Sequence, residues 1–160
     1  MSENRPKILK ICRAYAWNRC DQDDLYQEIL FQIWRGLPNL KEESYASTWL
    51  YRIALNASMS FVRQKTSRGA AQTTTHDHAQ LEQILETQLA PDARNDQLAR
   101  LYEAIAQLND VEKALITLFL EDLSYEQIAA VMGLTESNVG VTLHRAKKKL
   151  LTLMKEVANE

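Results

Sequence analysis

The chain has 160 residues, of which 46% are hydrophobic and 25% are charged. This composition excludes a disordered or fibrous chain and leaves room for one domain or two small ones. The longest apolar runs fall far short of the roughly 18 residues that a membrane helix needs. No apolar segment follows the first charged residues, so no secretory signal is visible. We therefore expect a cytoplasmic protein without membrane insertion.

The two cysteines, Cys12 and Cys20, fit a reducing compartment. They form no CxxC pair and have no histidine nearby, so they do not have metal-ligand spacing. We expect both to be thiols of the hydrophobic core. The sequence predicts no metal site, no cofactor and no catalytic residues, because no nucleophile or carboxylate pair has a base beside it.

The net charge of −2 argues by itself against nucleic-acid binding, but the charges are strongly segregated. Residues 1–68 carry 11 basic and 7 acidic groups, whereas residues 69–110 carry 2 basic and 7 acidic groups. No acidic residue lies between Ser44 and His76, and none lies between Glu136 and Glu156. Two cationic stretches are thus separated by an anionic one.

Glycine and proline are scarce and strand-like alternation is absent, so the periodicity predicts an all-α protein. Apolar residues at spacings of three and four predict a first helix to about residue 19. A second should start at Asp21 or Asp23 and end near Gly36 and Pro38. A third should begin between residues 44 and 48 and reach about Gln64.

The helical pattern fails from about residue 66 to residue 96, which indicates a flexible acidic linker. It returns at residues 98–108, breaks at Asn109 and Asp110, and resumes afterwards. We therefore expect two small helical domains, residues 1–66 and 96–160, joined by a linker over residues 67–95.

The most specific local signal is a helix-turn-helix in the second domain. Ser124 with Gln127 predicts a capping box, and Gly133 can supply the left-handed residue that ends a short helix. Thr135 can then cap the next helix. Apolar residues with small Ala129 among them have the spacing that packs two such helices together. The second of these helices would read DNA.

The outward positions of that second helix are polar or basic, and a lysine cluster follows them. Arginine can discriminate a guanine, whereas lysines give sequence-independent affinity for phosphates. A solvated basic face on a helical hairpin is the plainer interpretation, but cap, glycine, packing and charge agree on DNA binding. The predicted minus-35 contacts are Ser137, Asn138, Val141, Thr142, Arg145, Lys147, Lys148 and Lys149.

The first domain carries weaker signals. Acidic and amide side chains lie along the second helix together with Trp34. Acidic residues at the start of a helix are more often partners of the helix dipole. The third helix mixes Trp49, Tyr51 and Phe61 with arginines, which suits stacking on unpaired bases and following a backbone. Trp49 and Phe61 are more simply core residues.

Three segments together resemble the sigma factors of bacterial RNA polymerase, of the extracytoplasmic-function group of the sigma-70 family. Residues 23–28 with Trp34 resemble the segment that docks on the coiled coil of the polymerase β′ subunit. Residues 48–56 resemble the segment that opens and reads the minus-ten element. Residues 123–149 resemble the helix-turn-helix that reads the minus-35 element. The order and separation of the three motifs make the resemblance more specific than any one alone.

The resemblance implies a factor that lends promoter recognition to a core polymerase and catalyses nothing itself. It implies core RNA polymerase, through β′ and β, and promoter DNA as partners, and it leaves room for an anti-sigma factor. The implied polymerase contacts are Asp24, Leu25, Gln27, Glu28 and Trp34. The loop over residues 39–47 and Asn56 would accept an extruded base. The implied minus-ten contacts are Lys41, Ser44, Tyr45, Tyr51, Arg52, Asn56, Arg63 and Lys65.

Two other functions remain open at this point. A free-standing helix-turn-helix regulator would bind a palindromic operator as a dimer and would need no polymerase. A purely protein-binding adaptor would leave the lysine cluster without a role. A sigma factor instead should bind DNA weakly alone, because a slack linker leaves its two readers unaligned.

Overall fold

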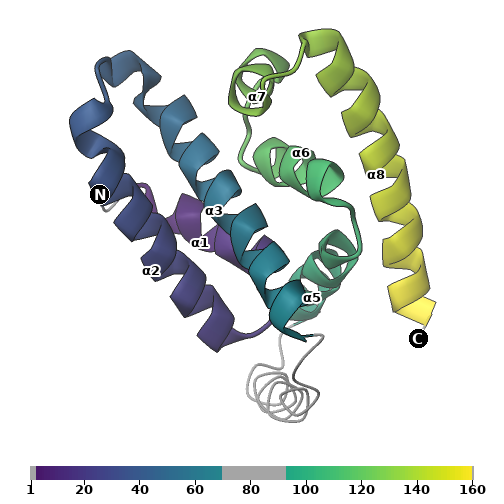
Figure 1. The fold of residues 1–160 in the computed structure, drawn as a ribbon. Helices are drawn as coiled ribbons and strands as arrows, with labels where there is room; N and C mark the ends of the chain where they lie inside the picture. The colour runs from purple at the N-terminus through teal and green to yellow at the C-terminus, as the bar shows by residue number, and fades with distance from the viewer. Residues whose placement is uncertain (1–2, 70–92, 160) are drawn as a thin grey trace.

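A computed structural model describes residues 3–69 and 93–159, and in these two ranges the chain is helical with no strand (Figure 1). The all-α prediction is confirmed. Most of the predicted linker lies outside the described residues. No helix in the two ranges is long and apolar enough to span a membrane. The helices are α1 (Arg5–Tyr15), α2 (Arg19–Gly36), η1 (Leu37–Asn39), η2 (Glu43–Tyr45), α3 (Ala46–Gly69), α5 (Ala93–Ala106), α6 (Asp110–Leu120), α7 (Tyr125–Met132) and α8 (Glu136–Asn159).

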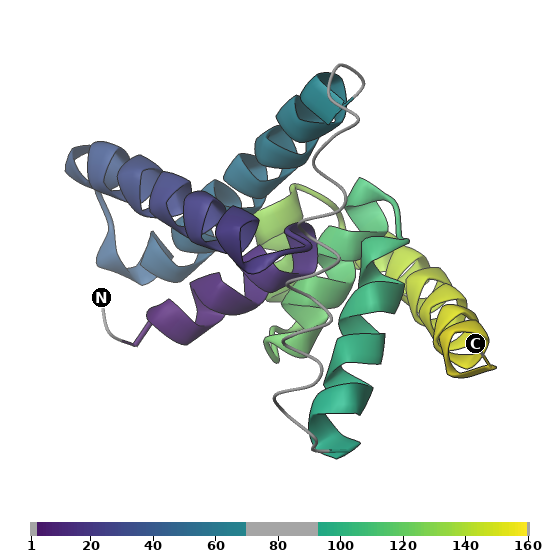
Figure 2. The ribbon, with the colours of Figure 1, turned by 90° about the horizontal axis from the view of Figure 1, so that it is seen from below.

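Helices α1, α2 and α3 form the N-terminal unit. Helices α2 and α3 run side by side, and α1 packs against both (Figures 1 and 2). Their apolar rows meet in a core that includes Ile11, Leu25, Ile29 and Ala54, each at most 1% exposed. The spacing of three and four residues in these rows puts them on one face of each helix, which is why the three helices bury them together.

The start of α2 and the end of α3 differ from the predicted helix ends. Helix α2 begins at Arg19 because Asn18 caps it: the amide of Asp21 donates to Asn18 Oδ1 at 2.8 Å. An uncharged Asn therefore does what we expected of Asp21 or Asp23. Helix α3 continues to Gly69, beyond the predicted end at Gln64.

Helices α5 to α8 form the C-terminal unit, with Ile105, Leu115 and Leu143 fully buried between them. The predicted break at Asn109 and Asp110 is confirmed and has a physical cause. Asn109 forms a capping box with Glu112, in which each side chain accepts from the other residue's amide, and it starts α6.

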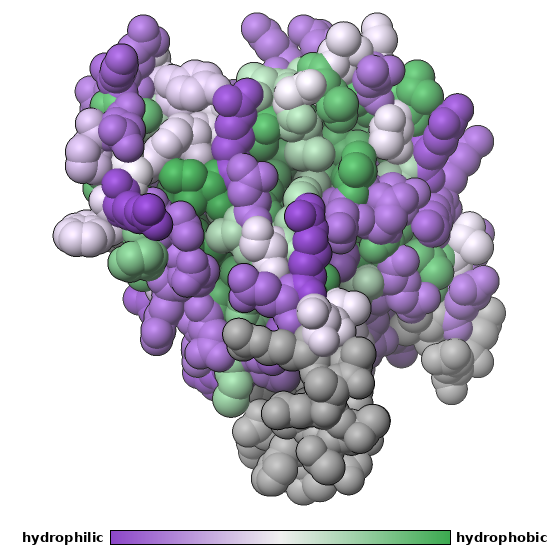
Figure 3. All heavy atoms as spheres, viewed as in Figure 1, coloured by the Kyte–Doolittle hydropathy of each residue, from purple (hydrophilic) through white to green (hydrophobic). Residues whose placement is uncertain are grey.

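The two units contact each other. Helix α1 packs on α5 and α6, and α3 packs on α7, so the buried residues of both units form one continuous cluster. On the face seen in Figure 3, hydrophobic side chains are visible between α2 and α3 and near α7, while hydrophilic ones cover the outer edges.

The two cysteines do not share an environment, which corrects the expectation that both lie in the core. Cys12 is fully buried, whereas Cys20 is exposed at the start of α2. Burial raises the pKa of the Cys12 thiol to about 12. This thiol therefore stays protonated and unreactive at neutral pH.

We expect a thiol reagent at pH 8 to modify Cys20 rapidly and Cys12 only as fast as the chain unfolds. The measurement is the time course of thiol modification in native buffer and in guanidinium chloride. Cys20→Ser should remove the fast phase and leave the slow one. Rapid modification of both thiols in the native chain would contradict the burial of Cys12.

The contact of α2 with α3 includes a close approach at Gly36. A Cβ at this residue would lie 2.8 Å from Cζ2 of Trp49. We expect Gly36→Ala to lower the free energy of unfolding by about 1–3 kcal/mol through overpacking. Urea denaturation followed by circular dichroism measures this change.

Gly140→Ala is the matched control for Gly36→Ala. A Cβ at Gly140 would meet the ring of Tyr125 at 3.5 Å, which is ordinary contact. Alanine should therefore stabilise the interior of α8 by up to about 1 kcal/mol. Equal stability of the Gly36→Ala and wild-type proteins would refute the close approach.

Candidate nucleic-acid and protein interfaces

Helices α7 and α8 form the predicted helix-turn-helix. The amide of Gln127 donates to Ser124 Oγ at 3.2 Å, and the amide of Ser124 donates to Gln127 Oε1 at 2.9 Å. Gly133 takes a left-handed φ of 69° and ends α7, and Thr135 Oγ1 accepts from the Asn138 amide at 3.2 Å. All three predicted features of the turn are confirmed. They rest on local hydrogen bonds, which is why the sequence revealed them.

One row of α8 is buried and fixes the orientation of the helix. Val139, Leu143 and Ala146 are fully buried, and Leu150 is 8% exposed. The opposite side therefore faces outward, because side chains turn by about 100° per residue along an α-helix. Ser137, Val141, Arg145 and Lys148 lie on this outer face and are exposed.

Two other predicted residues lie at one flank of the outer face: Asn138 is exposed and Thr142 is half-buried. His144 is exposed on the outer side of α8 and was not among the predicted contacts. Its helical position, seven residues after Ser137, was the available signal.

Two lysines of the predicted basic cluster are engaged within the C-terminal unit. Lys149 Nζ lies 3.1 Å from Glu112 Oε2, and Lys147 Nζ lies 3.7 Å from the centre of the Phe119 ring. Both contacts join α8 to α6. Arg145 and Lys148 are therefore the cations that the geometry best presents to a DNA groove.

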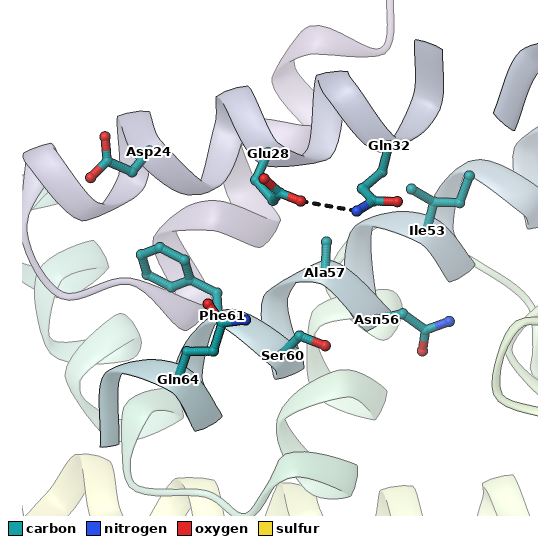
Figure 4. Close-up of a pocket in the computed structure, with 9 residues that line it drawn as sticks. All are labelled: Asp24, Glu28, Gln32, Ile53, Asn56, Ala57, Ser60, Phe61 and Gln64. Atoms are coloured by element: carbon teal, nitrogen blue, oxygen red, sulfur yellow. Dashed lines mark hydrogen bonds between the residues drawn. The ribbon is translucent and has the colours of Figure 1, made fainter. Parts of the chain in front are cut away.

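A cleft of about 650 Å³ lies on the surface between part of α2 and part of α3 (Figure 4). On the α2 side of the cleft, Glu28 accepts a hydrogen bond from Gln32 Nε2 at 2.9 Å. On the α3 side, the amide of Asn56 points away from Asp24 and Glu28 (Figure 4). The acidic side of the cleft suits the charged end of a lysine or arginine side chain, and the apolar lining residues suit the aliphatic part of that side chain. The cleft is lined by Asp24, Glu28, Gln32, Ile53, Asn56, Ala57, Ser60, Phe61 and Gln64.

The outer surface of α2 continues this acidic side. Gln27, Phe31 and Trp34 have the spacing of one helix face, and the two aromatic residues are 52% and 71% exposed. Phe31 was missing from the predicted set, although its spacing could have found it. Leu25, which was also predicted to contact a partner, is fully buried with the apolar row of α2 in this structure.

The predicted minus-ten residues are divided between three environments. Lys41, Ser44, Asn56 and Arg63 are exposed. Lys65 is engaged in an ion pair with Asp21. Tyr45 is exposed in η2, and its ring lies 5.6 Å from the guanidinium of Arg52.

Tyr51 and Arg52, two of the predicted minus-ten residues, lie at the contact with the C-terminal unit. Tyr51 is 3% exposed, and its hydroxyl lies 3.5 Å from Glu121 Oε2. Burial, and then the charge and hydrogen bond of Glu121, raise the pKa of Tyr51 to about 12, so its hydroxyl remains a donor. Tyr51 and Glu121 are 70 residues apart in the sequence, and no local pattern predicted their contact.

No group of histidine, cysteine or acidic residues within the described ranges could hold a metal ion. The two surfaces that the structure presents are a basic outer face on α8 and an acidic, aromatic surface on α2. The first suits a polyanion, and the second suits a cationic protein surface.

Family models match both units. Residues 1–68 match region 2 of sigma-70, and residues 98–150 match region 4 of sigma-70. The sigma factor YlaC of Bacillus subtilis is 30% identical over 136 residues, which cover 79% of this chain and 73% of that protein. The chain belongs to the sigma-70 family. It is therefore a sigma factor, a protein that acts in transcription initiation and is not an enzyme.

Further relatives refine this assignment. The extracytoplasmic-function sigma factor SigE of Mycolicibacterium smegmatis is 26% identical over 99% of this chain and 61% of its own length. The sigma factor RpoE of Bartonella quintana, solved with the anti-sigma factor NepR, shares the fold with a TM-score of 0.66. It is 20% identical, and the match covers 96% of this chain and 95% of that one. The sigma factor described here belongs to the extracytoplasmic-function group.

Proposed function

We propose that this sigma factor directs core RNA polymerase to promoters by reading both a minus-ten and a minus-35 element. The observation that carries the proposal is the match of sigma-70 regions 2 and 4 to one chain whose α8 presents an exposed basic face. Transcription in vitro with core polymerase on genomic fragments tests it. Selective initiation supports the proposal, and tight binding to a palindrome without polymerase supports a dimeric regulator instead.

In this proposal α2 docks on the coiled coil of the polymerase β′ subunit, and the C-terminal unit contacts the β subunit. The exposed Trp34 and Phe31 supply the apolar anchors that dominate protein interfaces. Asp24 and Glu28 supply charge complementary to a cationic partner. Because polymerase is its partner, we place the chain in the cytoplasm. The complex of RpoE with NepR supports an anti-sigma factor as a further partner.

The outer face of α8 reads the minus-35 element. Arg145 can form a bidentate contact with a guanine, whereas Lys148, three residues further on, can neutralise a phosphate. The loop over residues 39–47, with Asn56 and Arg63 on α3, meets the minus-ten strand. Their exposure supports this assignment, and the absence of acidic residues over 45–75 favours a phosphate backbone.

Reversing the charge of Asp24 and Glu28 together, each to Lys, should weaken binding to core polymerase at least about 30-fold, because complementary charges would become repulsive. Co-purification and fluorescence anisotropy with labelled sigma factor measure this loss. Glu3→Lys with Glu156→Lys is the control, since both are exposed and lie outside α2. Unchanged affinity of the α2 variant would refute the docking surface.

Arg145→Ala should reduce discrimination between minus-35 sequences by about 1–3 kcal/mol. Lys148→Ala should instead weaken all promoters alike and lower the salt dependence of holoenzyme binding by about one unit of slope. Competitive transcription and binding from 50 to 200 mM salt distinguish the two. A uniform loss with Arg145→Ala would make this residue a phosphate contact.

A further inference from the structure

Val141 is an exposed apolar residue in the middle of the outer face of α8, which lies at an edge of the molecule (Figure 1). It follows the buried Val139 by two residues, so its side chain is turned by about 200° from the buried row. It is 53% exposed. Ser137 precedes it by one turn and Arg145 follows it by one turn, and both are exposed. The three side chains therefore share one stripe along the helix.

The surroundings of Val141 on α8 are polar. Among residues 137–148, it is the only exposed residue with an apolar side chain. On the flank toward α7, Gly140 has no side chain, and a Cβ there would lie 3.5 Å from the ring of Tyr125. On the opposite flank, Thr142 is half-buried. Val141 is therefore the one apolar point on this part of the outer face.

A valine at this place restricts which base can lie opposite it. A single exposed valine is ordinary on a surface that stays in water. The outer face of α8 loses that water when it enters a DNA groove, as in the proposed function. Valine offers no donor or acceptor, so a polar base edge opposite it would lose hydrogen bonds to water and gain none. Thymine is the base that presents a methyl group in the major groove, and Val141 therefore suits a thymine.

The position of Val141 also relates this thymine to the base that Arg145 contacts. Four residues advance an α-helix by about 6 Å. Recognition helices place residues three or four positions apart on neighbouring base pairs. The bases that face Val141 and Arg145 should therefore be about one or two pairs apart. A β-branched side chain has one strongly preferred χ1 rotamer in a helix, so Val141 loses little freedom on binding.

We propose that Val141 is a specificity-determining residue that recognises the C5-methyl group of a thymine in the minus-35 element. This thymine lies within about two base pairs of the guanine that Arg145 contacts. The contact is apolar, so it adds selectivity without adding salt dependence, unlike a contact to phosphate. The inference rests on the proposed function, because it requires that the outer face of α8 enters a DNA groove.

Replacing thymine by deoxyuridine removes only the C5-methyl group and tests the contact directly. The duplexes are selected from a random-sequence pool by the full-length chain, once with core polymerase and once without it. Each thymine of the selected element is then replaced in turn, and binding is measured by fluorescence anisotropy. One replacement should weaken binding about fourfold, the effect of burying one methyl group. This loss should be the same at 50 and 200 mM salt.

Two valine variants assign the effect to α8. Val141→Ser should bind the thymine and deoxyuridine duplexes equally, because it removes the methyl groups that face the thymine. Val111→Ser is the matched control, since this valine is 47% exposed and lies on α6. It should keep the difference of about fourfold. Arg145→Ala identifies the guanine, because base changes there should no longer alter the affinity.

The outcomes distinguish failure of this contact from failure of the proposed function. Equal binding of thymine and deoxyuridine at every position in the wild type overturns the contact, and so does a difference that persists in Val141→Ser. A selected element without thymine near the guanine overturns it as well. Selection by the free chain but not with core polymerase overturns the proposed function, and deoxyuridine still decides the role of Val141. If neither selection enriches an element, both are overturned.

Discussion

The short helices of this sigma factor depend on side chains that satisfy the backbone groups at their ends. Asn18, Asn109 and Ser124 each accept from an amide in the first turn, and each such cap contributes about 1 kcal/mol. These bonds set where α2, α6 and α7 begin and so which faces meet in the core. The far end of α7 is different, because Arg52 of the other unit bonds to its carbonyls. The same physical requirement that defines the helices thus also joins the two units.

The local charge of each surface, and not the net charge of the chain, indicates which partner that surface suits. A net charge of −2 gives no indication of DNA binding, but the field at a surface depends on the groups nearby. The outer face of α8 combines Arg145 and Lys148 and is suited to phosphates. The α2 surface combines carboxylates with Trp34 and is suited to a protein. One small chain can therefore offer surfaces to polymerase and to promoter DNA without the two competing.

The contact between the units relates folding to function. The contact combines an apolar cluster that runs through both units with polar contacts around Glu121. Burial raises the pKa of Tyr51 to about 12, so its hydroxyl stays protonated and can donate to Glu121. A partner that binds both units could offset the loss of the contacts between the units with the contacts that it makes itself.

The sequence by itself determined the helical class, the break at Asn109 and the turn at Gly133. These features depend on hydrogen bonds and apolar spacings within a few residues, which a linear pattern contains. The division at residues 66 and 96 stays a prediction. Leu25 belongs both to the apolar row of α2 and to the docking motif, and in this structure it is buried with the apolar row.

Only the tertiary structure decided which members of each predicted set are free to bind a partner. Lys147 and Lys149 contact α6, while Arg145 and Lys148 lie on the outer face, although all four belong to one basic stretch. Tyr51 and Arg52 face residues 70 or more positions away. Helical periodicity says which side chains share a face, but packing between distant helices decides which faces are covered. For that reason the kind of partner could be read from the sequence, and the accessible residues could not.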